Sequence, residues 1–154
     1  MTNKMRGIVL IATAVVLAGW IGGLLESASA QNSAEKSKIV LNVTSGREDL
    51  HAVTMALQLA GHALDDGRGA VLFLNVRAPD MARRDLPESL VAHGNPPIRQ
   101  MLADLTKRGA LVLVCPSCAK VMGVTKADLI EGAEFATKDS LFGSLGPNTA
   151  VFTY

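Results

Sequence analysis

The chain has 154 residues, of which 49% are hydrophobic and 19% are charged, the size and composition of one ordinary globular domain. Its formal net charge at pH 7 is +1, and it contains only four Phe, one Tyr and one Trp. The chain therefore lacks both the basic excess that binds nucleic acids or anionic membranes and the aromatic residues on which bases stack. We expect neither nucleic acid nor membrane lipid as a partner of the folded domain.

The first 30 residues have the pattern of a secretory signal peptide. Lys4 and Arg6 precede an uncharged apolar run over residues 7–25, and an Ala-Ser-Ala cleavage site occupies residues 28–30. An uncleaved membrane anchor is the alternative, because the nineteen uncharged residues approach the length that spans a bilayer. Cleavage would leave 13 basic and 13 acidic residues. The sequence thus predicts an exported, formally neutral protein, periplasmic if the source is a Gram-negative bacterium.

The first half of the mature chain reads as a strand, a helix and a second strand. A polar, flexible lead-in over residues 31–37 precedes an apolar, β-branched strand at residues 39–43. A turn at residues 44–46 follows, and then a helix that ends at Asp66-Gly67 with an apolar stripe of Leu50, Val53, Leu57, Ala60 and Leu64. Residues 70–76 are almost continuously apolar, which is typical of a parallel strand covered on both faces.

The second half repeats this alternation after a long irregular loop over residues 77–97, a length typical of lids and interfaces. An amphipathic helix from Ile98 stops at the basic turn and glycine of residues 107–109, and a third strand at residues 110–114 runs into the segment CPSC. The remaining expected elements are a helix to residues 122–123, a helical turn at 126–129, a short strand at 133–135, a polar helix or loop through 146, and a last strand at 150–154.

This alternation predicts one three-layer α/β/α domain over residues 38–154, with a mainly parallel sheet of about five strands. The turn after the first strand, TSGRED, lacks the glycine spacing of either nucleotide-binding fingerprint. We therefore expect no nucleotide cofactor.

The two cysteines, Cys115 and Cys118, are the candidate reactive groups. In open parallel sheets, functional groups gather at the carboxyl ends of the strands, and Cys115 follows the third strand directly. A cysteine in the first turn of a helix is favoured as thiolate by the backbone N–H groups there, and Pro116 suits that turn. This arrangement predicts Cys115 as the attacking thiolate and Cys118 as the resolving thiol.

Two other interpretations of the pair remain open at this point. An exported protein can oxidise two nearby cysteines to a structural disulfide, although so small a loop removes little entropy from the unfolded chain. A zinc site needs four ligands, and His51 and His62 lie about 16 Å apart along one predicted helix. Copper(I) needs only two thiolates, with Met122 as a further candidate ligand. We expect no metal.

Together these motifs resemble the DsrE/DsrF-like family, which includes the TusD subunit of the sulfur relay used in tRNA thiolation. The resemblance covers residues 39–154 through the order and spacing of T-S-G-R-E-D-L, M-A-L-Q-L-A, V-L-F-L-N-V, R-G-A-L-V-L-V-C, Gly123, D-L-I-E-G-A-E and A-V-F-T-Y. It implies a three-layer α/β fold, a homo-oligomer such as a trimer or hexamer, and a cysteine that accepts sulfur as a persulfide, here Cys115. Cys118 is an addition relative to members that work with a single thiol.

We therefore expect an exported protein that handles sulfane sulfur through Cys115 and Cys118 with a sulfur donor or acceptor protein as partner. The signal peptide departs from the cytosolic relay members and argues against a role in tRNA thiolation. Further candidates for the site are Thr44, Ser45, Arg83, Arg84 and His93, with the arginines steadying an anionic sulfur compound. The rival functions are a non-catalytic oligomeric binding module with a structural CxxC disulfide, and a thiol-disulfide oxidoreductase.

Overall fold

The computed structural model describes residues 37–154, so the predicted signal peptide lies outside the described residues, as does the lead-in up to residue 36. Five strands in this part of the chain form one sheet in the order β4-β3-β2-β1-β5, and every neighbouring pair is parallel. The strands are β1 (Lys38–Val43), β2 (Ala70–Leu74), β3 (Leu111–Val114), β4 (Ala133–Phe135) and β5 (Thr149–Thr153). All of their carboxyl ends therefore lie at one edge of the sheet.

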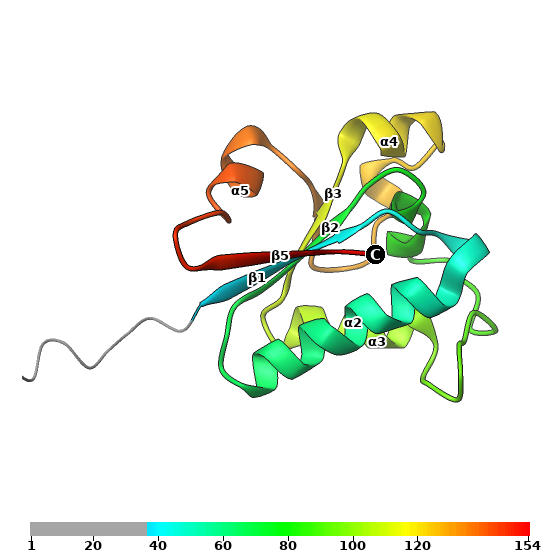
Figure 1. The fold of residues 1–154 in the computed structure, drawn as a ribbon. Helices are drawn as coiled ribbons and strands as arrows, with labels where there is room; N and C mark the ends of the chain where they lie inside the picture. Colours follow the sequence, from blue (N-terminus) through cyan, green and yellow to red (C-terminus); the bar gives the residue numbers. More distant parts are fainter. Residues whose placement is uncertain (1–36) are drawn as a thin grey trace, which may run out of the picture. The chain divides into compact units, whose positions relative to one another are not determined.

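Helices cover both faces of this sheet (Figure 1). One face packs on α2 (Leu50–Asp65) and α3 (Ile98–Lys107) and carries the larger apolar core, with Leu41, Leu72 and Val112 fully buried. On the other face, a small cluster of Val40, Val71 and Leu113 packs against Leu141 of α5 (Lys138–Phe142). The result is the three-layer α/β/α fold that the sequence predicts, and the sheet is parallel throughout the described residues.

The remaining elements stand at the carboxyl edge of the sheet, on the right-hand side of Figure 1. They are the short helix α4 (Pro116–Val121) and the 3-10 turns η1 (Arg47–Asp49), η2 (Ala78–Ala82) and η3 (Lys126–Asp128). Among residues 37–154, no helix is both long and apolar enough to cross a membrane.

The predicted elements are present, and their bounds differ by a few residues. The second strand is the informative difference, because it ends at Leu74 instead of continuing through Val76. Asn75 and Val76 leave the sheet in a turn in which Ala78 N–H donates to the Asn75 carbonyl, with 2.9 Å between nitrogen and oxygen. The loop over residues 77–97 is also not wholly irregular, since η2 lies within it and Met81 is fully buried there.

Candidate thiol site at the carboxyl end of the sheet

Cys115 lies where β3 ends and α4 begins. Its N–H donates to the Leu74 carbonyl at 2.9 Å, so the pairing of β3 with β2 continues to this residue. Its backbone is extended (φ −61°, ψ 115°), and Pro116 occupies the first position of the helix, where no backbone donor is needed. The sequence prediction of a strand-to-helix junction at Cys115 is confirmed.

The two thiols are free and half-buried. The pKa of Cys118 is raised, first by its hydrogen bond with Cys115 and then by burial, while a hydrogen bond from the Val76 N–H opposes the rise. A raised pKa means that Cys118 holds its proton to a higher pH than an ordinary thiol does.

Val76 supplies a backbone donor that the sequence did not reveal. Its N–H points to Cys118 Sγ, with 3.2 Å between nitrogen and sulfur. Its φ is +54°, in the left-handed region that a β-branched residue rarely adopts. Such a conformation costs about 1–2 kcal/mol for a residue other than glycine. A valine after an apolar strand reads simply as more strand, so its residue type gave no signal.

Neutral side chains hold the end of β2 beside the thiols. Asn75 Nδ2 donates to Asn42 Oδ1 at 2.5 Å, and Asn42 Nδ2 donates to Thr153 Oγ1 at 3.3 Å. These contacts tie together β2, β1 and β5, three strands that are neighbours in the sheet. The turn that carries Val76 is therefore fastened to the middle of the sheet.

Thr44 and Ser45 follow β1 at the same edge of the sheet. The Thr44 hydroxyl and N–H both donate to the carbonyl of Tyr154, each at 2.7 Å, and the Thr44 carbonyl accepts from Arg77 N–H at 3.1 Å. Thr44 thus fixes the end of the chain and the start of the 77–97 loop. Ser45 is half-buried next to it.

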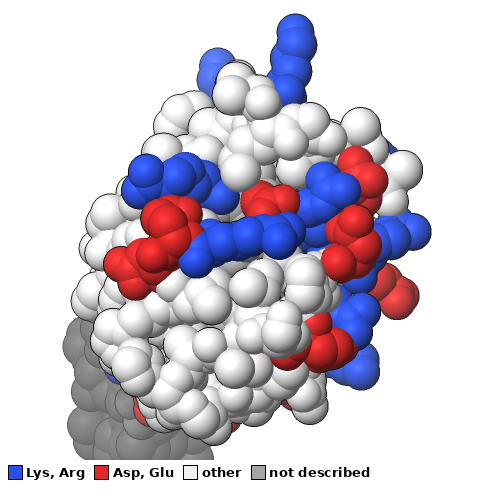
Figure 2. All heavy atoms as spheres, turned by 90° about the vertical axis from the view of Figure 1, so that its right-hand side faces the viewer, with Lys and Arg blue, Asp and Glu red and all other residues white. Residues whose placement is uncertain are grey.

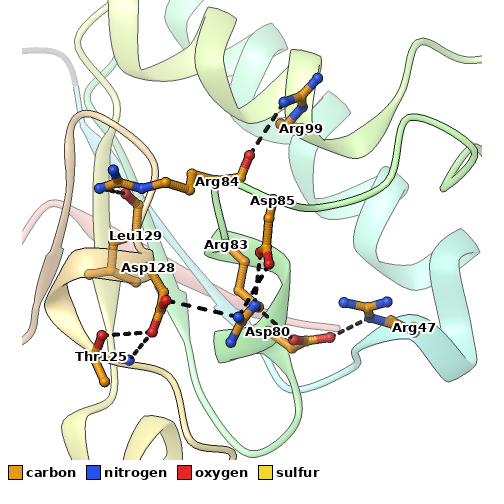
Figure 3. A network of polar contacts seen from close by, with 9 residues as sticks. All are labelled: Arg47, Asp80, Arg83, Arg84, Asp85, Arg99, Thr125, Asp128 and Leu129. Carbon is orange, nitrogen blue, oxygen red and sulfur yellow. Dashed lines mark hydrogen bonds and ion pairs between the residues drawn. The ribbon is translucent and has the colours of Figure 1, made fainter.

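Arg83 and Arg84 belong to a network that joins the 77–97 loop to η3 (Figure 3). The Arg83 guanidinium contacts three carboxylates, those of Asp85 at 3.0 Å, Asp80 at 3.8 Å and Asp128 at 3.9 Å. Arg84 turns the other way and donates from Nη2 to the Leu129 carbonyl at 3.1 Å. Both side chains therefore have protein partners, and their role with a substrate stays a prediction.

Hydrogen bonds to the carboxylates set the electrostatics of this network. The Arg83 guanidinium lowers the pKa of Asp85, and the hydroxyl and N–H of Thr125 are the main cause of the lowered pKa of Asp128. Arg47 forms a further ion pair with Asp80. On the face at the right of Figure 1, Lys and Arg alternate with Asp and Glu in one band (Figure 2). This face therefore presents paired charges and no large region of one sign.

His93 lies against helix α2. Its ring meets that of His51 edge to face, with 4.6 Å between the ring centroids, and its φ is +50°. Nearby, Gln58 Nε2 donates to Asn95 Oδ1 at 2.6 Å. The contact with α2 gives His93 a packing partner, and its role as an acid or base stays a prediction. Within residues 37–154, no three His, Cys, Asp or Glu side chains gather as metal ligands would.

Comparison with family models identifies one family, and relatives and solved structures are also similar to this chain. The model of the DsrE/DsrF-like family matches residues 37–153. An uncharacterized protein of Methanocaldococcus jannaschii is 30% identical over 116 residues, which cover 75% of this chain and 96% of that protein. Among solved structures, the ychN protein from E. coli is 26% identical, with a TM-score of 0.65 over 77% of this chain and 99% of that one.

A second solved structure supports the fold alone. It is the protein of unknown function MTH1491 from Methanobacterium thermoautotrophicum, which is 15% identical. Its TM-score is 0.57, and the similarity covers 77% of this chain and 99% of that one.

Proposed function

The chain belongs to the DsrE/DsrF-like family, whose members generally act in sulfur relay, and we propose that it accepts sulfane sulfur as a persulfide on Cys115 and resolves it with Cys118. The observation that carries this proposal is the place of Cys115 at the junction of β3 and α4, with Cys118 in the first turn of the same helix. The pKa of Cys118 is raised, and we therefore assign the first attack to Cys115. It lies at the carboxyl edge of a parallel sheet, where a donor can approach.

The proposed reaction has two steps. The Cys115 thiolate attacks the outer sulfur of a donor persulfide, a bond to that sulfur forms, and the donor leaves as a thiolate. Cys118 then attacks Cys115 Sγ, so that the Cys115–Cys118 disulfide forms and the carried sulfur leaves as hydrosulfide. The two cysteines are oxidised and the sulfane sulfur is reduced, so an external dithiol is needed to restore the pair. If an acceptor takes the sulfur first, the second step does not occur.

Mass spectrometry of the reduced protein after anaerobic treatment with a sulfane donor tests this function. The Cys118→Ser variant is expected to gain one sulfur atom, about 32 Da, at Cys115. The matched Cys115→Ser variant should gain none there, while the native pair should release hydrosulfide and form the disulfide. If Cys118→Ser takes up no sulfur, the carrier function is wrong, and the pair then serves as a structural staple or in thiol-disulfide exchange.

We further propose that the protein assembles with copies of itself. Large apolar side chains stay exposed near α5 and along the edge strand β5, namely Phe142 (59% exposed), Leu145 (45%), Val151 (58%) and Phe152 (41%). Apolar surface of this kind beside a sheet edge is typical of an interface. Light scattering should give an oligomer for the native protein and a smaller species for Phe152→Lys. A native monomer would contradict this proposal.

We also propose that the chain is exported, as the pattern of residues 1–30 indicates. Protein purified from its native source should then begin at Gln31. An intact N-terminus at Met1 would contradict cleavage.

A further inference from the structure

The backbone N–H of Val76 contacts Cys118 Sγ from a strained conformation. We propose that Val76 is a positioning residue whose backbone N–H stabilises the Cys118 thiolate as it forms, and so sets the rate of the resolving step. The inference rests on the proposed function only in taking Cys115 as the thiol that reacts first and Cys118 as the thiol that resolves the product. It concerns any disulfide or persulfide on Cys115 that Cys118 resolves.

The structure holds this unfavourable conformation of Val76 firmly. On one side Asn75 N–H donates to the Val43 carbonyl at 2.9 Å, and on the other Arg77 N–H donates to the Thr44 carbonyl at 3.1 Å. Val76 lies between these two anchors with φ +54°, and the residue is 54% exposed, so burial of its side chain does not explain the strain. What the conformation achieves is the contact of its N–H with Cys118 Sγ.

In the resolving step, the Val76 N–H faces the sulfur that has to lose its proton. In the reduced pair, the neighbouring Cys115 thiol raises the pKa of Cys118. Once Cys115 is bonded to another sulfur, it is a poor acceptor for the Cys118 proton. Cys118 must then lose its proton to solvent, break its S–H bond and form the S–S bond with Cys115, while the leaving sulfur departs with the bonding electrons. The Val76 N–H still faces the sulfur on which negative charge develops.

Replacing one atom tests this role. The full chain is made with the α-hydroxy analogue of valine at position 76, which turns the amide N–H into an ester oxygen and keeps the side chain. The matched control places the same analogue at Val91, whose N–H donates to the Ser89 carbonyl and to no sulfur. Both esters weaken the preceding carbonyl, and both carbonyls accept one backbone N–H, Asn75 from Ala78 and Leu90 from Ile98.

The readout is the release of thionitrobenzoate from dithiobis(nitrobenzoate). Attack by Cys115 forms a mixed disulfide and releases the first equivalent, and attack by Cys118 closes the protein disulfide and releases the second. The two phases thus report the two cysteines separately. They require no persulfide, so the inference can fail while the sulfur-carrier function stands, and the carrier function can fail while the inference stands.

We expect the ester at position 76 to slow the second phase and to move its pH midpoint upwards. Where the fraction of Cys118 present as thiolate falls tenfold, each remaining thiolate is about threefold more nucleophilic, because its sulfur is more basic. The second phase is then about threefold slower. The first phase and the Val91 ester should match the native protein. A purely structural role for the Val76 amide would leave the pH midpoint of the second phase unchanged.

A Val76→Gly variant separates the N–H from the side chain. Glycine adopts a positive φ without strain and keeps its N–H, so the second phase should slow less than in the ester and keep its pH midpoint. Three results would overturn the proposal: an unchanged second phase in the Val76 ester, an equal change in the Val91 ester, or a second phase that slows as much in Val76→Gly as in the ester.

Discussion

Two regions at the carboxyl edge of the sheet are held together in opposite ways. The thiol region consists of Asn75, Val76, Cys115 and Cys118. It relies on neutral hydrogen bonds, and the backbone of Val76 is strained. The ionic region consists of Asp80, Arg83, Asp85 and Asp128. It relies on charges, because the Arg83 guanidinium faces all three carboxylates (Figure 3). Both regions carry groups that the sequence singled out as candidates for the site.

This difference separates groups available for chemistry from groups engaged in holding the fold. A thiol whose partners are another thiol and one strained N–H can change its protonation and its bonds at little cost to the fold. The ionic region instead joins the 77–97 loop to η3, where Arg84 N–H donates to the Asp128 carbonyl and Ile130 N–H to the Ala82 carbonyl, each at 2.8 Å. An anionic substrate at Arg83 would have to compete with three carboxylates already in place.

The larger expected effect on stability comes from the thiol region. Asn75→Ala removes the donor to Asn42 Oδ1 and a fastening of the turn that carries Val76. Losing one such hydrogen bond costs about 1 kcal/mol of the free energy of unfolding. Because no side-chain amide titrates between pH 4 and pH 7, the loss in the free energy of unfolding should be the same at both ends of this range. Urea denaturation at pH 7 and at pH 4 checks this.

Asn75→Ala should also slow the second phase of thionitrobenzoate release, since the Val76 N–H is less firmly placed. Asn95→Ala is the matched control, because Asn95 accepts a similar side-chain hydrogen bond from Gln58, on α2. A destabilisation in Asn75→Ala that leaves the second phase unchanged would mean that this side chain supports the fold alone.

Much of the fold could be predicted because its signals are local. The apolar stripe of α2, the glycine that follows α3 and the continuous apolar run of β2 each act within one element, and they set the order of strands and helices. Cys115 could be found for the same reason, since a cysteine and a proline directly after a buried strand mark a strand-to-helix junction.

The rest depends on contacts between residues far apart in the chain. Val76 and Cys118 are 42 positions apart, and Arg83 meets Asp128 from a different loop. No pattern of residue types specifies that the end of β2 turns into the left-handed region to meet a sulfur. An arginine pair in a loop likewise looks free until the structure shows the carboxylates around it. The Asp-rich sequence near Arg83 was the available signal for that pairing.

The smaller expected effect comes from Arg83→Gln, which keeps the aliphatic stem and a polar end, shortens the side chain and removes its charge. Arg83 lowers the pKa of Asp85 in the folded protein, so its contribution to stability is present above the ordinary carboxyl range, about pH 4, and is lost as the pH falls through the lower folded pKa. The difference in urea midpoint between native protein and variant should therefore be largest near pH 7, vanish in acid and shrink with added salt. Arg68→Gln is the matched control, because the Arg68 pair with Asp66 lies outside the network, at the end of α2. A difference for Arg83→Gln that stays constant with pH would show that the stem of the side chain, and not its charge, holds the loop.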